Sequence, residues 1–385
     1  MAQPKLIRVT TVPSSLKILM KGQHAFMSEH FEVVGVSSKG EELNEVANAE
    51  GIRVVPIEMT RTISPFKDVS SVWRLYKLFR KEKPLMVHTH TPKAGIAGMM
   101  AAKFAGVKIR LHTVAGLPLM EATGLKRKIL NAVEKLTYRC ATKVYPNSKG
   151  LYDFILKEKF TSEKHLKVIA NGSSNGIDVS HFNTEKISSE VKQSLRKSLA
   201  IEADTYVFVF VGRLVGDKGL NEMVSAFKEL SESNERVRLL LVGGAESELD
   251  PLQPDTIQEM EANEHIISVG FQNDVRSYFA ISNALVFPTY REGFPNVVMQ
   301  AGAMKLPAIV TNINGCNEII IEGENGTIIP TKDRDLLLDA MRTFADGAYE
   351  NKGAMCRKMI VDRYEQSVVW EALLKEYKQQ QTSVS

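Results

Sequence analysis

Two basic residues follow an apolar run in the second half of the chain, and their surroundings suit them to hold an anion. Residues 206–220 read YVFVFVGRLVGDKGL, so Gly212 and Arg213 directly follow a predicted buried strand, and Lys218 precedes a predicted helix over Leu220–Leu230. The free N–H groups and the dipole of a helix N-terminus attract anions, and a guanidinium beside an ammonium suits phosphate oxygens. The pattern favours a diphosphate site, with a glycine turn between two surface cations as the alternative. The spacing is neither Gly-x-Gly-x-x-Gly nor a Walker loop, which argues against a dinucleotide or ATP site.

A carboxylate follows another predicted strand. Residues 287–303 read FPTYREGFPNVVMQAGA, so Glu292 lies in a polar loop and Pro295 stands where the next helix is expected to begin. Because the carboxyl ends of parallel strands share one edge of a sheet, Glu292 is expected near Arg213. Beside a cationic phosphate pocket, a carboxylate suits sugar hydroxyls. The alternative is an acid that only neutralises the helix dipole.

Three weaker signals occur elsewhere. His88 and His90 end a predicted strand and lie two residues apart, but the sequence shows no third ligand, so no metal site is predicted. His112, inside an apolar strand, is predicted to be a hydrogen-bonded core residue. Gly243 follows a strand over Arg238–Val242, where it would let a nucleotide approach the backbone or would serve only in a turn.

Alternating strands and helices must position these residues. Apolar strands are predicted at Leu6–Val9, Phe31–Val36, Ile52–Ile57, Leu85–His88, Ile109–Thr113, Lys143–Tyr145 and Leu166–Ile169, then at Tyr206–Val211, Arg238–Val242, Ile266–Val269, Ala284–Phe287 and Pro307–Thr311. Helical periodicity lies between them, for example over Asp68–Lys83, Ala94–Phe104 and Leu125–Ala141. This pattern is typical of parallel sheets covered on both faces.

The 385 residues divide at a segment rich in Gly, Ser and Asn, 171–183. The strand–helix pattern restarts after it. We therefore predict an α/β fold of two Rossmann-like doubly wound domains facing a central cleft, residues 1–182 and 183–365, followed by a C-terminal helix over 366–385.

The formal net charge of +4 hides an asymmetry. Residues 1–180 hold 28 Lys and Arg against 15 Asp and Glu, and the remainder hold 21 against 30. Basic amphipathic stretches over Trp73–Lys81 and Lys126–Arg139 account for much of the first-half excess. Such faces rest on anionic lipid, although each alone is also typical of a solvated helix. Cysteine is too sparse for a disulfide framework, and from the residue pattern we expect neither a signal peptide nor a membrane-spanning segment. We expect a cytoplasmic protein with a peripheral place on the cytoplasmic face of the inner membrane.

With these motifs the sequence resembles the bacterial family 4 retaining glycosyltransferases of GT-B architecture, and among them those that build capsular, exopolysaccharide or lipid-linked glycans. Gly212-Arg213 with Lys218-Gly219 is similar to the family's diphosphate-binding stretch, and Glu292–Pro295 to its donor-sugar stretch. Residues 314–318 fall in the usual place downstream.

The resemblance implies transfer of a sugar from a nucleotide diphosphate sugar, UDP-linked, to a lipid-linked or growing surface glycan with retained anomeric configuration. It implies no metal and no other cofactor, no nucleic acid partner, and a C-terminal helix that crosses back to the first domain. Arg213, Lys218 and Glu292 are the implied catalytic residues. The implied donor-binding residues are Gly212, Gly243, Phe271, Gly293, Phe294, Pro295, Asn296 and Gln300. The acceptor or phosphate side is implied to include Ser14, Ser15, His90, Lys93 and Gly116.

Three departures from the family pattern stand out. Gln300 replaces the second of two glutamates and leaves an amide to hold the ribose hydroxyls. Ala115 replaces the histidine of a His-Gly pair, and residues 11–15, TVPSS, replace a Gly-Gly loop. An inactive glycan-binding relative therefore stays as an alternative. A UDP-sugar epimerase stays as another because it can share the architecture, although the stretch Glu292–Pro295 argues against it.

Overall fold

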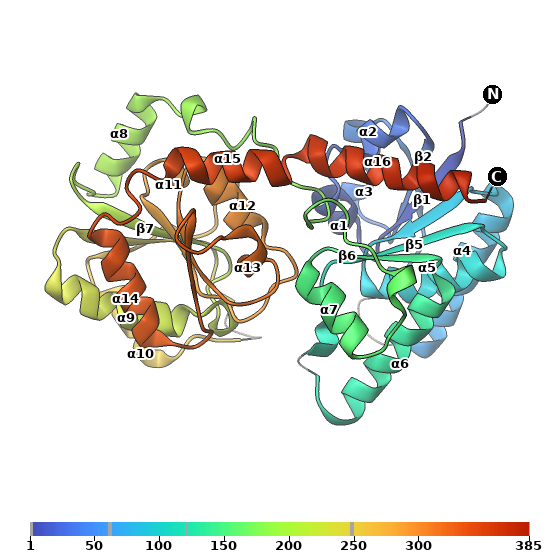
Figure 1. The fold of residues 1–385 in the computed structure, drawn as a ribbon, viewed down its shortest axis with the longest axis horizontal. Helices are drawn as coiled ribbons and strands as arrows, with labels where there is room; N and C mark the ends of the chain where they lie inside the picture. The colour runs from blue at the N-terminus through green and yellow to red at the C-terminus, as the bar shows by residue number, and fades with distance from the viewer. Residues whose placement is uncertain (1–2, 61–63, 121, 247–249, 385) are drawn as a thin grey trace. The chain divides into compact units, whose positions relative to one another are not determined.

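The computed structural model describes residues 3–60, 64–120, 122–246 and 250–384. The chain forms two compact units (Figure 1), one made of residues 1–176 and 367–385 and the other of residues 177–366. The domain boundary predicted after residue 182 thus falls a little way inside the second unit. Each unit holds a parallel sheet with helices packed on it, so the predicted α/β fold of two doubly wound domains is confirmed.

The described strands of the first unit pair in the order β3-β2-β1-β4-β5-β6. They are β1 (Lys5–Val9), β2 (Glu32–Ser37), β3 (Arg53–Pro56), β4 (Met86–Thr89), β5 (Ile109–Val114) and β6 (Lys143–Pro146). The helices are α1 (Pro13–Leu19), α2 (Gln23–Ser28), α3 (Glu41–Glu50), α4 (Pro65–Glu82), α5 (Pro92–Phe104), α6 (Gly124–Cys140), α7 (Lys149–Lys157) and α16 (Gln366–Thr382). Helix α16 joins this unit through buried Tyr377, whose hydroxyl accepts a hydrogen bond of 3.2 Å from Arg8.

The described strands of the second unit pair in the order β12-β11-β10-β7-β8-β9. They are β7 (Tyr206–Val211), β8 (Val237–Val242), β9 (Ile266–Ser268), β10 (Ala284–Phe287), β11 (Ala308–Thr311) and β12 (Gly326–Ile329). The helices are α8 (Ser189–Ser198), α9 (Leu220–Ser233), α10 (Pro254–Ala262), α11 (Arg276–Ala280), α12 (Asn296–Ala303), α13 (Cys316–Ile319), α14 (Arg334–Ala345) and α15 (Gly353–Tyr364). β7 lies at the centre of the sheet, which explains its uninterrupted apolar sequence.

Two strand predictions were wrong. Residues 166–169 form no strand; Leu166 makes only an isolated bridge to Val144 of β6, because the chain soon turns away at Ala170, where φ is +48°. Conversely, β12 was missed because it is short and begins with a glycine. A Cβ at Gly326 would lie 2.1 Å from the carbonyl oxygen of Ala308, so close pairing with β11 requires that glycine.

A buried carboxyl lies in the first unit, on the inner face of α6. Burial raises the pKa of Glu134 to about 7. In the unfolded chain this carboxyl titrates near 4.5. Between those two pH values the folded protein therefore binds more protons than the unfolded chain, so stability falls as pH rises through this window.

We expect Glu134→Gln to remove this pH dependence. Above pH 7 the variant should be more stable than the parent, by up to about 3 kcal/mol. Urea unfolding at pH 5 and pH 8 measures the difference. Glu41→Gln, at an exposed position on α3, is the control and should follow the parent at both values. Equal losses between pH 5 and pH 8 in parent and Glu134→Gln would show that Glu134 does not carry the dependence.

Candidate functional site

In the second unit, the segment with Arg213 and Lys218 and the segment with Glu292 follow two neighbouring strands. β7 and β10 pair in parallel, so the loops that follow them begin at the same edge of the sheet. The first loop runs through a short 3-10 turn, Gly216–Lys218, into α9. The second loop runs from Pro288 to Pro295 and leads into α12.

The two loops contact each other closely through main-chain and side-chain atoms. Gly219 has φ of +72°, and a Cβ there would lie 2.1 Å from the carbonyl oxygen of Pro288. The Tyr290 N–H donates a hydrogen bond of 2.9 Å to the carbonyl oxygen of Asp217. The guanidinium of Arg291 pairs with the Asp217 carboxylate at 2.6 Å. The predicted proximity of the two loops is thus built from main-chain contacts and an ion pair that only the fold supplies.

An ion pair joins the two loops. Lys218 Nζ lies 2.5 Å from Glu292 Oε1, and the two side chains are only 14% and 20% exposed. The same ammonium lies 5.8 Å from the centroid of the Phe287 ring. Screening is weak in such a half-buried position, so each charge strongly affects the other.

Arg213 forms an ion pair with a residue that the sequence analysis did not single out. Its Nη1 lies 2.5 Å from Glu246 Oε2, and both side chains are about half exposed. Sequence reasoning missed Glu246, although it follows the glycine pair after β8 at the same sheet edge. It also missed Asp250, whose carboxylate accepts a hydrogen bond of 2.5 Å from the Asp217 N–H.

Gly212, Gly243 and Gly270 follow β7, β8 and β9, and the main chains of these loops contact one another. A Cβ at Gly243 would lie 1.7 Å from the carbonyl oxygen of Gly212, and the Gly243 N–H donates to Gly270 over 2.9 Å. The neighbouring loop therefore accounts for the glycine at position 243. Phe271 directly follows Gly270, and its ring is 74% exposed.

The stretch at residues 314–318 packs on the loop between β10 and α12. Gly315 has φ of +74°, and a Cβ there would lie 2.8 Å from Phe294 Cα and from Pro295 Cδ. Cys316 is buried, and burial together with the Glu292 carboxylate raises the pKa of its thiol well above the usual value.

The remaining predicted donor residues lie around α12. Pro295 precedes the helix as its N-cap, so the prediction that it would open the helix was one residue early. Asn296 is the first helical residue and is exposed, and Gln300 is half-buried in the second turn. Gly293 and Phe294 lie in the preceding loop, where the Phe294 ring packs 5.4 Å from that of Tyr364.

The first unit spreads its candidate residues over several elements. Ser14 and Ser15 lie in the first turn of α1, so the expected loop after β1 is shorter than the sequence suggested. Lys93 on α5 pairs with Asp68 at 2.6 Å. Gly116 follows β5, and a Cβ there would meet no atom within 4 Å. His90 is buried, which lowers the pKa of its imidazole well below the usual value.

Two further histidines are held by hydrogen bonds. The ring nitrogens of His88 lie 2.5 Å from the Tyr377 hydroxyl and 2.8 Å from the Thr113 hydroxyl. His112 contacts the Thr89 hydroxyl at 2.7 Å, and burial lowers its pKa to about 4. The prediction of a core histidine is confirmed for His112.

Within the described residues, no helix is both long and apolar enough to cross a membrane.

Comparison with known proteins identifies the family. The family model for glycosyl transferases group 1 matches residues 191–360, and that for the glycosyl transferase 4-like domain matches residues 23–172. The capsular polysaccharide biosynthesis glycosyltransferase CapM of Staphylococcus aureus is 33% identical to this chain, and the alignment covers 97% of this chain and 96% of CapM. The UDP-Gal:alpha-D-GlcNAc-diphosphoundecaprenol alpha-1,3-galactosyltransferase of Escherichia coli is 31% identical over 80% of this chain and 78% of its own.

The fold has close counterparts among solved structures. The crystal structure of a glycosyltransferase from Rickettsia africae matches with a TM-score of 0.80 at 17% identity and covers 99% of both chains. The resemblance inferred from the motifs is thereby confirmed. This chain belongs to the family 4 glycosyltransferases of GT-B architecture.

Proposed function

We propose that this glycosyltransferase moves a sugar from a UDP-linked donor to a lipid-linked or growing surface glycan, with retention of configuration and without a metal ion or other cofactor. The observation that carries the proposal is the Lys218–Glu292 pair, which joins the loops that follow β7 and β10. Arg213 lies in the first of these loops. The relatives support the substrate classes. One is named for capsular polysaccharide, and the other for a UDP-sugar donor and a diphosphoundecaprenol acceptor.

The reaction needs charge stabilisation more than a strong base. The bond between the anomeric carbon and the diphosphate oxygen breaks, and its electron pair goes to the departing diphosphate. Arg213, Lys218 and the N–H groups at the start of α9 stabilise that charge, and such stabilisation is usually the largest catalytic term. The acceptor oxygen bonds to the anomeric carbon from the same face, and its proton passes to an oxygen of the leaving phosphate.

Both ion pairs can be exchanged for contacts with a diphosphate. When the diphosphate binds, its oxygens replace Glu292 as the partner of Lys218 and Glu246 as the partner of Arg213. The released Glu292 carboxylate then accepts hydrogen bonds from sugar hydroxyls and positions the donor. Phe271, with its exposed ring, supplies a surface on which the base stacks.

A thermal-shift screen with UDP, GDP, ADP and common UDP-sugars tests this function. A ligand that binds only the native state raises the melting temperature, so UDP and one UDP-sugar should do so. Turnover of that sugar is then followed with undecaprenyl diphosphate-linked acceptors. Interconversion of the sugar without an acceptor would favour the epimerase, and no response to any nucleotide would favour the inactive relative.

Glu246 competes with the donor for Arg213. We expect Glu246→Gln to bind UDP a few-fold more tightly, because a half-exposed ion pair is worth at most about 1 kcal/mol. Isothermal titration with UDP measures the change. Glu235→Gln, which precedes β8 at the opposite end of that strand, is the control. Unchanged or weaker UDP binding in Glu246→Gln would contradict the competition.

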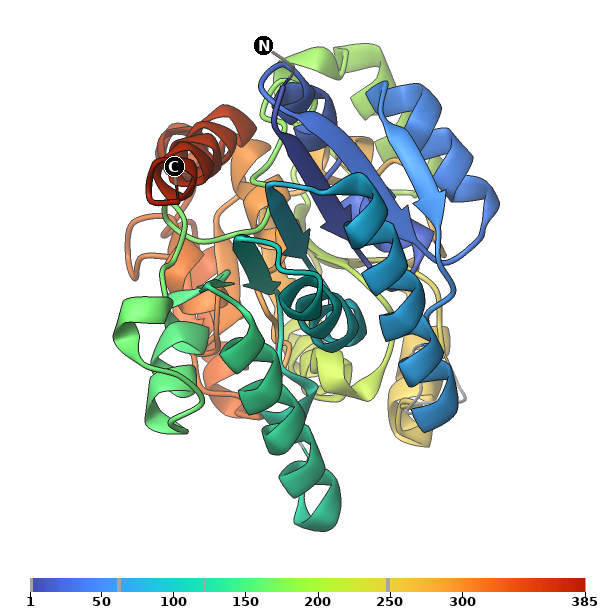
Figure 2. The same ribbon diagram turned by 90° about the vertical axis from the view of Figure 1, so that its right-hand side faces the viewer.

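We propose further that the first unit rests on an anionic membrane surface through α4 and α6. α5 packs against both, and Figure 2 shows the three helices side by side. The outer face of α4 exposes Phe66, Val69 and Trp73 together with Lys77. The Phe66 ring is 93% exposed. Exposed apolar side chains among lysines are typical of helices that lie in the membrane interface.

A flotation assay checks this attachment. Vesicles of phosphatidylglycerol in phosphatidylcholine should carry the protein at low salt and release much of it at 0.5 M NaCl, because salt screens the attraction. Phe66→Ser with Trp73→Ser should lower the bound fraction at both salt concentrations, since apolar insertion is lost. Equal flotation on neutral and anionic vesicles would contradict an electrostatic attachment.

A further inference from the structure

A second ion pair joins the two loops of the site, directly beside the first. Asp217 precedes Lys218 in the chain, and Arg291 precedes Glu292. Arg291 Nη2 and Nε donate to the same oxygen, Asp217 Oδ2, at 2.6 Å and 2.9 Å. The two pairs thus lie side by side with opposite charge order, and the proposed contacts with the donor use neither Asp217 nor Arg291.

The main chain of Asp217 receives the same loop. Its carbonyl oxygen accepts hydrogen bonds from the Tyr290 N–H at 2.9 Å and from the Thr289 hydroxyl at 3.3 Å. Its own N–H donates to the Asp250 carboxylate at 2.5 Å. The three residues that precede Glu292, at positions 289, 290 and 291, therefore all contact Asp217. These contacts set the register of Glu292 against Lys218.

The two partners of the second pair differ in burial. The Asp217 side chain is 15% exposed, whereas that of Arg291 is 51% exposed. Asp217 Oδ1 is buried and makes no hydrogen bond of ordinary geometry within the described residues, so the contact with Arg291 falls on Oδ2. A charge withdrawn from water depends on its partner more than an exposed charge does. Loss of the guanidinium should therefore destabilise the loops more than loss of the carboxylate.

The reaction proposed above separates Lys218 from Glu292. The diphosphate takes the ammonium as its partner, and the sugar hydroxyls take the carboxylate. The first ion pair then no longer joins the loops, although both groups must stay in place. A misplacement of about 1 Å in an active site costs about a hundredfold in rate. A link that the donor does not open is needed at this step.

We propose that Asp217 and Arg291 form a positioning pair, which holds the Glu292 carboxylate in register with Lys218 while the donor is bound. Neither residue touches the donor in this role. The role rests on the proposed function, because it matters only if Glu292 positions the donor sugar. It adds that the loops keep their geometry through the second ion pair when the first has opened.

Single and double variants test the pair with the full chain. Asp217→Asn and Arg291→Gln should each lower kcat by about tenfold, as expected for a displaced positioning group. The Kd for UDP should change little, because UDP has no sugar for Glu292 to hold. The double variant should lose no more than Arg291→Gln alone, since both substitutions remove one interaction. Arg291→Lys, which keeps the charge but not the planar fork, should lie between Arg291→Gln and the parent.

The Glu292→Gln background separates positioning from general stability. If the pair acts through the Glu292 carboxylate, Arg291→Gln should cost far less kcat in Glu292→Gln than in the parent. Melting temperatures follow the structural effect, and Arg291→Gln should melt lower than Asp217→Asn. The control is Asp204→Asn with Arg236→Gln, which removes an exposed ion pair before β7 and β8 and should keep the parent's kcat.

The possible outcomes are distinct. An equal loss of kcat in the parent and in Glu292→Gln would overturn the positioning role and leave a purely structural ion pair. A parental kcat in both single variants would overturn it as well. If Arg291→Gln does not fold, Asp217→Asn and Arg291→Lys give the same comparison in the two backgrounds. Absence of sugar transfer by the parent would instead refute the proposed function, and the positioning role with it.

Discussion

Lys218→Ala is expected to lower kcat by about a hundredfold or more, the usual cost of deleting one group that stabilises charge in a transition state. The Lys218 side chain is only 14% exposed, and Lys218 is the last residue of the 3-10 turn before α9. In the proposed donor complex the ammonium faces the diphosphate, whose charge grows as the glycosidic bond breaks. The loss should therefore fall on kcat more than on the Kd for the donor.

Arg213→Ala should act in the same direction with a smaller effect. Its guanidinium is about half exposed, so water can screen part of the leaving-group charge in its absence. With saturating donor, the kcat of Lys218→Ala should be lower than the kcat of Arg213→Ala. Lys228→Ala on α9, which removes an exposed lysine paired with Glu259, is the matched control and should keep the parent's kcat. Normal turnover in both site variants would refute the assignment.

Gly243→Ala is expected to destabilise the second unit by about 3 kcal/mol or more, the upper end of what overpacking usually costs. The new Cβ would lie 1.7 Å from the carbonyl oxygen of Gly212, and main chain on both sides must shift to admit it. Because Arg213 follows Gly212 directly, the shift also displaces the guanidinium. Donor affinity should therefore fall together with the unfolding midpoint.

The adjacent glycine provides the control. A Cβ at Gly244 would meet no atom within 4 Å, so Gly244→Ala should unfold at nearly the parent's urea concentration and bind UDP normally. The contrast between two neighbouring glycines isolates the close approach from the general cost of replacing a glycine. Equal urea midpoints and equal UDP affinities in the two variants would show that the glycine at position 243 is not required for close packing of the loops after β7 and β8.

Local pattern was enough to predict most of the fold. β7 and β10 begin and end where the sequence indicated, because buried parallel strands must be apolar on both faces and are bounded by turns. Where an element depends on distant partners, the prediction failed. β12 exists because β11 lies beside it, and residues 166–169 are no strand because the chain leaves β6 after one bridge.

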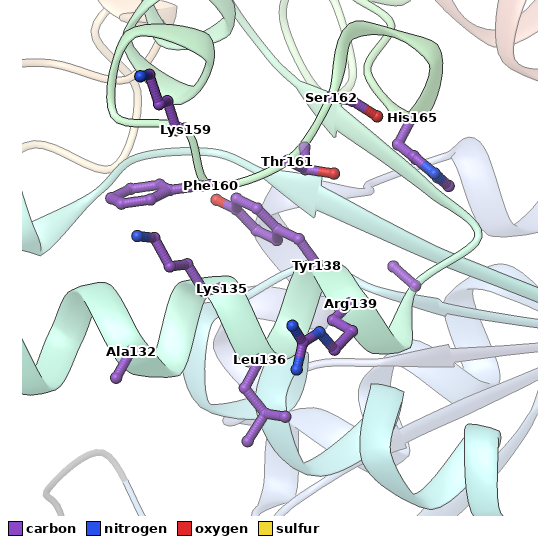
Figure 3. Close-up of a pocket in the computed structure, with 11 residues that line it drawn as sticks. Ala132, Lys135, Leu136, Tyr138, Arg139, Lys159, Phe160, Thr161, Ser162 and His165 are labelled. Carbon is purple, nitrogen blue, oxygen red and sulfur yellow. The ribbon is translucent and has the colours of Figure 1, made fainter.

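The sequence by itself determined the family, the two α/β halves and the residues that carry charge at the site, since these follow from residue type and local spacing. Only the tertiary structure decided the partners of those charges. Glu292 meets Lys218, and Arg213 meets Glu246, because neighbouring strands bring together loops that lie tens of residues apart in the chain. The pocket between α6 and residues 159–165, drawn in Figure 3, arises in the same way. Lys135 and Lys159 share no local pattern, and both line this pocket only because the segment after α7 folds back along α6.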